Sequence, residues 1–321
     1  MFETQSELIR ELIAAGLDGY ADQLGELARP CLHFAAASSR SGEAGSGAVR
    51  FGGRPELPEG MSWPYRPALP HAEAFRAWLR DDQLAFVWGT PRPLTFFAQV
   101  DLARAAAVYP DPWPLPSSGR LYFFWDWVCG CFGQGATNTR VIWDCTETSL
   151  LAPLDYPAVD YPRDVIALPP ILPARHFDLK PAWSCPSQRM MKWLIPDEKL
   201  GELLSTEPFQ ELYWQRIHAW SFTGSSLVHR MLGWSTPIQD EPAIDAAAEA
   251  SGVADVPLTW PTRETIAPLL PTMSDWLLLM QVELADAYQD KGVEGIVYFM
   301  VTRKDAEAGC FDRATAVYQQ T

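Results

Sequence analysis

The sequence predicts an α+β protein that is internally duplicated, with two pseudo-symmetric repeats of mixed or antiparallel sheet and with peripheral helices. The first observation is a pair of strongly apolar stretches, residues 94–102 and 119–127, typical of buried central strands. The second is a similar pair near the C-terminus. The third is a turn rich in glycine and proline before each pair, where neither regular helix nor central strand is expected.

The predicted repeat depends on three blocks that recur in the same order. FFAQVDL at 96–102 aligns with LLMQVEL at 278–284, LYFF at 121–124 with VYFM at 297–300, and the turn GGRP at 52–55 with GWSTP at 233–237. Gly52 lies 47 residues before Gln99, and Gly233 lies 48 residues before Gln281. One repeat alone would leave its apolar sheet face exposed, so we expect the two to pack together. Chance similarity between apolar strands is the alternative.

Four segments follow from this interpretation, and together they are expected to form one compact domain. They are an N-terminal helical segment at 1–29, repeat 1 at 30–150, a proline-rich connector and helix at 151–210, and repeat 2 at 211–321. Helical spacing of apolar residues predicts one or two helices over 3–28, interrupted near Gly16 and Gly19. Further helices are expected at 72–82, 197–205, 208–220, 243–251 and 262–270, with strands at 31–36 and near 166–168.

The residues that shape the turns and strands are predicted to be structural. A buried amide needs hydrogen-bond partners, so each strand glutamine should bond across the sheet or to the glycine-rich turn. The expected structural positions are Gly52, Gly53, Pro55, Gln99, Gly233 and Gln281.

The charge balance favours some partners and excludes others. The chain has 25 Lys and Arg against 40 Asp and Glu, a net charge of −15 and a pI near 4.7. This argues against binding to nucleic acid phosphates or to an anionic membrane, which need clustered cations. It favours a basic protein partner, although acidity that only maintains solubility is the alternative.

The chain is expected to be cytoplasmic and to need no cofactor. It has no apolar run near the roughly 20 residues that span a bilayer, and its N-terminus lacks the basic region of a secretory signal. Cys129, Cys131 and Cys145 suggest a metal, but structural zinc usually needs two ligand pairs with wider spacing. Reduced thiols without metal are the favoured interpretation.

The same blocks resemble the YwqG-like family of bacterial proteins, a domain family of unknown function. FGGRPELP at 51–58, PLTFFAQVDL at 93–102 and GRLYFF at 119–124 are similar to its early motifs. HRMLGW at 229–234 is similar to its mid-chain signature, and DWLLLMQ at 275–281 and GIVYF at 295–299 to its C-terminal one. Where the family often has Trp-Gly-Asp, this chain has YQDKG at 288–292. The resemblance implies a fold, no established activity, and for some members a place near toxin genes.

Two groups of residues are candidates for binding, and none is proposed as catalytic. Trp125, Asp126 and Trp127 end a predicted strand, and an exposed strand end would give aromatic anchors beside a negative charge. The alternative is that both indoles are core and Asp126 belongs to a turn. His229 is the best general-base candidate, although a bracing hydrogen bond to the Gly233 turn is the alternative.

Three functions remain open from the sequence. The preferred hypothesis is a non-enzymatic acidic module that binds a basic protein, one candidate being an immunity protein that neutralises a bacterial toxin. The second is a small-molecule-binding or hydrolytic enzyme with a cleft between the repeats, lined by Arg54, His229, Arg230 and Gln239. The third is a metal-binding regulator that uses the three cysteines named above.

Overall fold

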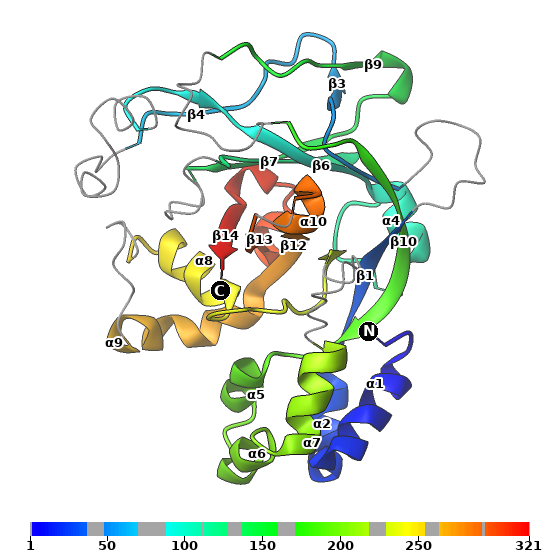
Figure 1. The fold of residues 1–321 in the computed structure, drawn as a ribbon, viewed down its shortest axis with the longest axis vertical. Coiled ribbons are helices and arrows are strands. Elements are labelled where there is room, and N and C mark those ends of the chain that lie inside the picture. The colour runs from blue at the N-terminus through cyan, green and yellow to red at the C-terminus, as the bar shows by residue number, and fades with distance from the viewer. Residues whose placement is uncertain are drawn as a thin grey trace.

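The computed structural model describes residues 2–36, 48–69, 88–110, 112–127, 137–159, 171–217, 229–253, 263–290 and 293–320. Within these residues, ten strands form one antiparallel sheet that curves into a nearly closed barrel (Figure 1). The strand order is β8-β7-β6-β2-β10-β1-β11-β12-β13-β14. The strands are β1 (Arg29–Ala36), β2 (Val49–Phe51), β6 (Thr95–Asp101), β7 (Arg120–Trp125), β8 (Thr139–Asp144), β10 (Arg175–Ser184), β11 (Arg230–Met231), β12 (Trp276–Glu283), β13 (Ile296–Thr302) and β14 (Thr315–Gln319).

Two strands that are far apart in the chain make the centre of this sheet. β1 pairs along its whole length with β10, and Leu32 lies opposite Pro181. On its other side β1 pairs with β11, whereas β10 pairs with β2. β1, which precedes β2 in the chain, therefore lies beside β11. β10, which precedes β11 in the chain, lies beside β2.

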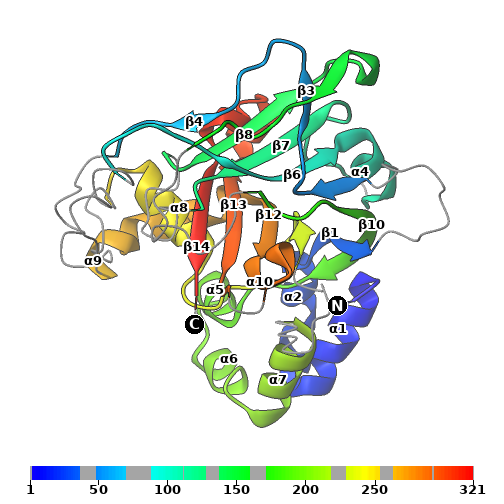
Figure 2. The ribbon, with the colours of Figure 1, turned by 45° about the horizontal axis from the view of Figure 1, so that its top comes forward.

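Corresponding features recur on the two sides of that centre (Figure 2). The register shifts at a bulge between Phe96 and Ala98 in β6, and again between Leu278 and Met280 in β12. A short helix follows each of these strands, α4 (Leu102–Val108) and α10 (Leu284–Tyr288). The first residue of each helix donates its backbone N–H to a glycine carbonyl, from Leu102 to Gly119 and from Leu284 to Gly295, both at 3.0 Å.

The interior of the barrel is a packed core rather than a channel. Aromatic rings from both sides of the sheet meet there, with ring centroids 6.0 Å apart for Phe97 and Phe299 and 5.2 Å apart for Phe123 and Phe299. These side chains are at most 1% exposed. Burial of such rings contributes roughly 1.5–3 kcal/mol each, so the two sides stabilise one another.

The two edges of the sheet, β8 and β14, approach each other, and side chains pack between them. The short helix α11 (Arg303–Glu307) and the turn η8 (Phe311–Arg313) lie between β13 and β14 in the chain. Trp143 of β8 packs on Phe311 with ring centroids 6.1 Å apart. A side chain at Gly309 would come within 2.8 Å of the Trp143 ring, so this approach needs glycine. The contact covers a strand edge that would otherwise invite pairing with another chain.

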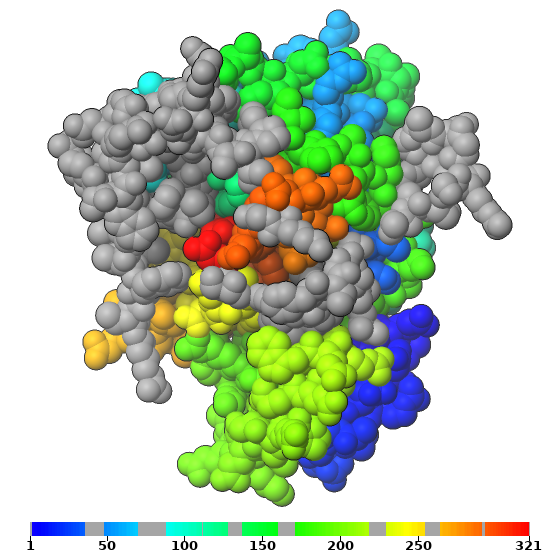
Figure 3. Space-filling view, in the orientation of Figure 1, coloured from blue at the N-terminus to red at the C-terminus, as the bar shows by residue number. Residues whose placement is uncertain are grey.

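A helical subdomain, defined as residues 2–28 and 185–217, projects from one end of the barrel (Figure 3). Side-chain caps at Thr4, Ser187 and Asp197 begin three of its helices. At Gly16, φ is 92°, which breaks the first helical stretch where glycine was expected to interrupt it. The subdomain comprises α1 (Gln5–Leu12), η1 (Ile13–Leu17), η2 (Asp18–Tyr20), α2 (Ala21–Leu27), α5 (Gln188–Leu194), α6 (Glu198–Leu203), α7 (Glu207–Leu212) and η6 (Tyr213–Ile217).

Smaller elements cover the outer faces of the sheet. The apolar side of α8 (Pro242–Ala250) packs against β13 and β14, together with α9 (Arg263–Ile266) and η7 (Ala267–Asp275). On the other side, Leu57 and Trp63 cover the outward side chains Phe96 and Phe124. Two short sheets lie there, β3 (Glu56–Pro58) with β9 (Leu151–Pro153), preceded by η5 (Thr148–Leu150), and β4 (Tyr65–Arg66) with β5 (Arg92–Pro93).

The expected fold class is confirmed at the level of helices with antiparallel sheet, and one detail needs correction. Every strand pair among the described residues is antiparallel, which is one of the two sheet types that the sequence predicted. The expected connector at 151–210 contains β10, a central strand, which its prolines concealed because Pro181 lies within the strand itself. The expected helix at 72–82 and strand near 166–168 lie outside the described residues. No described helix is long and apolar enough to cross a membrane.

Candidate functional site

The first glycine-rich turn is held against the sheet by its backbone. Gly52 and Gly53 have φ of 56° and 66°, values that glycine adopts without strain. A side chain at Gly52 would lie 2.5 Å from the carbonyl oxygen of Leu172. The backbone N–H of Gly52 donates to Phe97 and that of Gly53 to Leu172, both at 2.9 Å. The turn therefore requires both glycines.

Gln99 of β6 connects this turn to the sheet, which confirms the expected bonding of the strand glutamine. Its Oε1 accepts from Arg50 Nη2 at 2.9 Å and from the backbone N–H of Glu56 at 3.2 Å. Its Nε2 donates to the Glu56 carboxylate at 3.1 Å, and Arg50 forms an ion pair with that carboxylate at 3.2 Å. The Tyr122 hydroxyl donates to the Glu56 carbonyl at 2.6 Å.

The second turn is bonded in a corresponding way. Gln281 Oε1 accepts from the backbone N–H of Thr236 at 3.0 Å, and its Nε2 donates to Thr236 Oγ1 at 2.6 Å. The Tyr298 hydroxyl donates to the Thr236 carbonyl at 2.8 Å. Arg230 donates to Trp234 O and to Thr236 Oγ1, both at 3.3 Å. Arg230 is 4% exposed, and among the described residues no carboxylate pairs with it.

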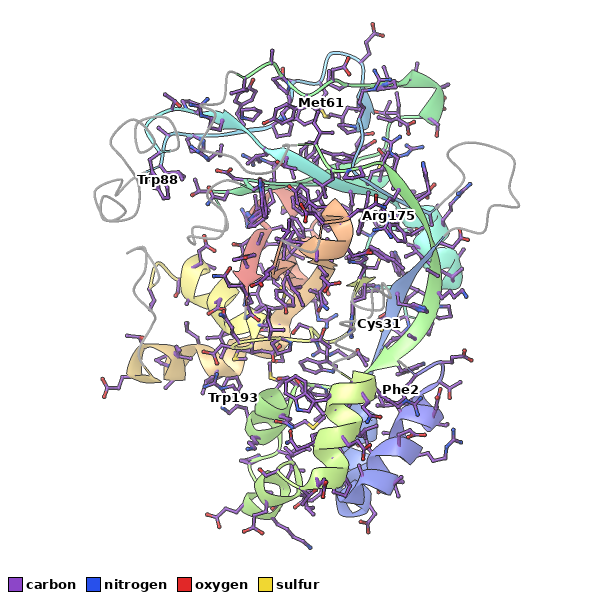
Figure 4. All side chains as sticks on the ribbon, in the orientation of Figure 1. Phe2, Cys31, Met61, Trp88, Arg175 and Trp193 are labelled. Atoms are coloured by element: carbon purple, nitrogen blue, oxygen red, sulfur yellow. The ribbon has the colours of Figure 1, made fainter. Side chains whose placement is uncertain are left out.

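His229 points to the other face of β11, into the barrel. Its Nδ1 accepts from the backbone N–H of Glu283 at 3.2 Å, so Nε2 carries the hydrogen and donates to Asp286 Oδ2 at 2.6 Å. Arg175 Nη1 donates to the same carboxylate oxygen at 2.7 Å. Figure 4 places Arg175 on β10. The ring of Phe51 packs edge-on against the imidazole, with centroids 5.0 Å apart.

Burial and charge set the protonation states of this group. Burial lowers the pKa of His229 and outweighs the Asp286 carboxylate, which acts to raise it. Burial acts to raise the pKa of Asp286, but the bonds from His229 and Arg175 prevail and lower it to about 2. His229 is therefore neutral and fully buried, and its ring nitrogens bond to Glu283 and Asp286 rather than to the Gly233 turn, so neither nitrogen is free to act as a base.

The four residues expected to line one cleft lie apart. β2 and β11 are separated in the sheet by β10 and β1, about 14 Å at the usual strand spacing. Arg54 is exposed and pairs with Asp155 at 3.2 Å. Gln239 donates from Nε2 to the carbonyl of Gln320 at 2.6 Å, near the C-terminus. His229 and Arg230 point to opposite faces of the sheet.

The expected aromatic anchor is largely inside the protein. Trp125 is 0% exposed and Asp126 is 2% exposed, so neither side chain is available at the surface. Asp126 forms an ion pair with Arg66, and its backbone N–H donates to Asn138 at 2.8 Å. Trp127 is half-buried. The core interpretation of the Trp125 indole therefore holds, whereas Asp126 is an ion-pair partner at the end of β7.

Of the three cysteines in the metal hypothesis, only Cys145 lies among the described residues. Cys31 and Cys185 are buried and free, and Cys145 and Cys310 are also free. No group of three or more potential ligands gathers in the described part of the chain. Cys129 and Cys131 lie outside it.

The sequence did not predict several polar contacts, because the residues that form them are distant in the chain. The carboxylate of Glu241 accepts from Ser187 Oγ and Ser235 Oγ at 2.5 Å each and ties the helical subdomain to the barrel. Burial raises the pKa of Glu241. Arg66 pairs with Asp126, which is 60 residues away in the chain, and Arg175 pairs with Asp286, which is 111 residues away. No local spacing marks such pairs.

The helical subdomain carries a shallow, open groove. Three of its seven lining residues are acidic; the lining consists of Lys192, Pro196, Asp197, Glu198, Gly201, Glu202 and Ser205. The subdomain contains eleven Asp and Glu against five Lys and Arg, a net charge of −6. Trp214 and Ile13 are 52% and 43% exposed on it. Apolar side chains within an acidic surface are typical of a docking face.

Comparison with other proteins identifies a family but no characterised relative. A search of curated proteins finds no match. Residues 49–319 match the model of a domain of unknown function, DUF1963. This match covers most of the chain, including both glycine-rich turns and the His229 group. The chain therefore belongs to the family of this domain of unknown function, DUF1963.

Proposed function

We propose that this protein is a non-enzymatic module that binds a basic protein through its acidic helical subdomain. The observation that carries the proposal is the combination of the carboxylate-lined groove with the exposed Trp214 on a projecting part of the molecule. Opposite charge would speed the encounter, and the exposed apolar residues would supply the contact energy. An immunity protein that masks a toxin domain is one form of this function.

Two carboxylates of the groove, those of Glu198 and Glu202, could act on a partner. Glu198 and Glu202 are exposed, and no ion pair involving either is found among the described residues. By contrast, Arg216 of the same subdomain is already held by Glu7 at 2.8 Å and Glu11 at 3.0 Å. In the groove's lining, the single cation Lys192 stands against three carboxylates, those of Asp197, Glu198 and Glu202, so the lining carries net negative charge.

The test compares baits that differ only in the groove. The tagged wild-type protein captures a partner from its own cells, and binding of the purified partner is then measured at low and high salt. The double variant Glu198→Lys, Glu202→Lys should weaken binding at least tenfold, and Trp214→Ala should weaken it without changing the salt dependence.

The matched control carries the same charge change on the barrel, Glu59→Lys with Glu147→Lys, both exposed. It should bind the partner nearly as well as the wild type. If the groove and control variants lost partner binding equally, the effect would come from the net charge of the protein and not from the groove. Undiminished binding by both groove variants, or no partner near stoichiometry, would refute the proposal.

We also propose that the two sides of the sheet descend from one duplicated unit of the YwqG-like kind. Support comes from the arginine opposite a glutamine in each register, Arg50 with Gln99 and Arg230 with Gln281. A tyrosine hydroxyl bonded to each turn adds to it, as do the two bulges. An experimental structure tests this idea: superposition of β2, β6, β7 and β8 on β11, β12, β13 and β14 should match strand for strand. A superposition that fails to bring the two arginines together would refute it.

A further inference from the structure

Three buried polar atoms without hydrogen-bond partners gather at one end of the barrel. They are Trp125 Nε1, Thr139 Oγ1 and Tyr288 OH, and no described residue bonds to any of them. The three residues are 0%, 2% and 6% exposed. Leaving such a group unsatisfied costs about 1–3 kcal/mol, so three in one place call for an explanation.

The strand register and the ring contacts bring these residues together. Trp125 and Thr139 are direct partners on β7 and β8, so their side chains share the inner face of the sheet. The Trp127 ring lies 6.1 Å from that of Trp125 and 4.9 Å from that of Tyr288. Tyr318 of β14 stacks on Trp125 with centroids 5.8 Å apart. We name these five residues the seam cluster, because they lie where β8 and β14 approach.

The seam cluster has an inner and an outer layer. The unbonded atoms belong to the three buried residues, whereas Trp127 and Tyr318 are half-buried and pack against the core from its margin. Flat rings at the outside and hydrogen-bond donors behind them are what a planar ligand with acceptor atoms requires.

The charged residue between the two indoles in the sequence already has a partner of opposite charge. Asp126 lies between Trp125 and Trp127 but points to the other face of the strand, where it pairs with Arg66. No charged side chain belongs to the cluster itself. A charged ligand would lose its hydration here without gaining a counter-ion, so an uncharged one fits better.

We propose that the seam cluster binds a small, uncharged, planar molecule that carries carbonyl-type acceptor oxygens. The ligand stacks on Trp127 and Tyr318 and accepts hydrogen bonds from the Trp125 indole, the Tyr288 hydroxyl and the Thr139 hydroxyl. This site is separate from the helical subdomain, so its test is independent of the proposed protein partner.

Benzamide is the probe, because it combines a planar ring with an uncharged amide. The indole N–H resonance of Trp125 is identified in the full-length ¹⁵N-labelled protein by its loss in Trp125→Phe. Titration with benzamide should shift this resonance saturably. Cyclohexanecarboxamide, which has the same amide on a puckered ring, and benzoate, which has the same ring with a charge, should bind at least fivefold more weakly.

The conservative variants Tyr288→Phe and Thr139→Val remove one hydroxyl each and keep the shape. Each should weaken benzamide binding about five- to tenfold. Tyr65→Phe, at an exposed position, should leave it unchanged.

Two results would overturn the proposal. One is the absence of any saturable shift, together with a persistent water contact at the Trp125 N–H. In that case the three unbonded atoms of the seam cluster would bind ordered water and no ligand. The other is equal binding of benzamide by the wild type and both hydroxyl variants.

Discussion

Arg230 stands opposite Gln281 as Arg50 stands opposite Gln99, but Arg230 has no carboxylate partner among the described residues. Glu56 supplies the carboxylate to Arg50, and Thr236 takes the corresponding place in the second turn. The second turn is also the more deeply buried, because Gln281 is 0% exposed whereas Gln99 is half-buried. The bonds of the second turn should therefore matter more for stability.

Gln281→Leu is expected to cost about 2–4 kcal/mol of unfolding free energy, because the buried Thr236 backbone N–H loses its acceptor and the Thr236 hydroxyl loses one of its two donors. Gln99→Leu should cost about 1 kcal/mol, because water can replace part of its bonding. Urea unfolding of the two variants measures the difference. Equal costs would contradict the assigned burial.

Asp126→Asn is expected to destabilise the protein by about 3–5 kcal/mol, since it replaces the carboxylate that pairs with the buried Arg66 guanidinium by a neutral amide. Asp155→Asn breaks a pair of the same type with Arg54 at the surface, where the side chains are 79% and 57% exposed. That control should cost less than about 1 kcal/mol. Thermal and urea unfolding provide the comparison, and a small effect at Asp126 would count against the buried pair.

Gly233→Ala is expected to cost well over about 2 kcal/mol. The residue has φ of 71°, and a side chain there would come within 2.4 Å of Ser184 Oγ and 2.7 Å of Cys31 Cβ. Gly60 has a similar φ of 83° with open space around it. Gly60→Ala should therefore show only the backbone strain, about 1–2 kcal/mol. The melting temperatures of the two variants separate the two contributions.

Stability is expected to fall as the pH drops through 6.5, in part because of His229. Burial lowers its pKa in the folded state, so the unfolded chain takes up a proton first and unfolding becomes easier by up to about 1.4 kcal/mol per pH unit. Replacement by glutamine, which does not titrate, should reduce this slope. Urea unfolding of wild type and His229→Gln at pH 7.5 and 5.5 checks it. An unchanged slope would show that other groups cause the pH dependence.

Short sequence patterns predicted the strands, turns and helices whose residues carry a clear local signal. The apolar runs that became β6, β7, β12 and β13, the glycine turns and the interrupted N-terminal helices were all legible in the sequence. β10 was not, because proline and charged residues interrupt its apolar pattern and its strand character comes from two long-range neighbours.

The candidate sites depend even more on contacts between residues that are far apart in the sequence, which local patterns do not reveal. The sequence singled out His229, but its acceptor Asp286 and the competing donor Arg175 come from elements that are far apart in the chain. Trp125 looked like a surface anchor because a strand end is usually exposed, yet the neighbouring strand edge β14 comes round to cover it with Tyr318. Barrel curvature is a property of the whole sheet, and no short segment encodes it.

The central position of β1 affects where a stable fragment of this protein can begin. The family match begins at residue 49, after β1 has ended at Ala36. A fragment that starts at this boundary would lack the strand between β10 and β11, and both would present bare edges to the solvent. Such a fragment should aggregate, whereas a synthetic peptide of residues 29–36 should rescue its solubility by refilling the gap.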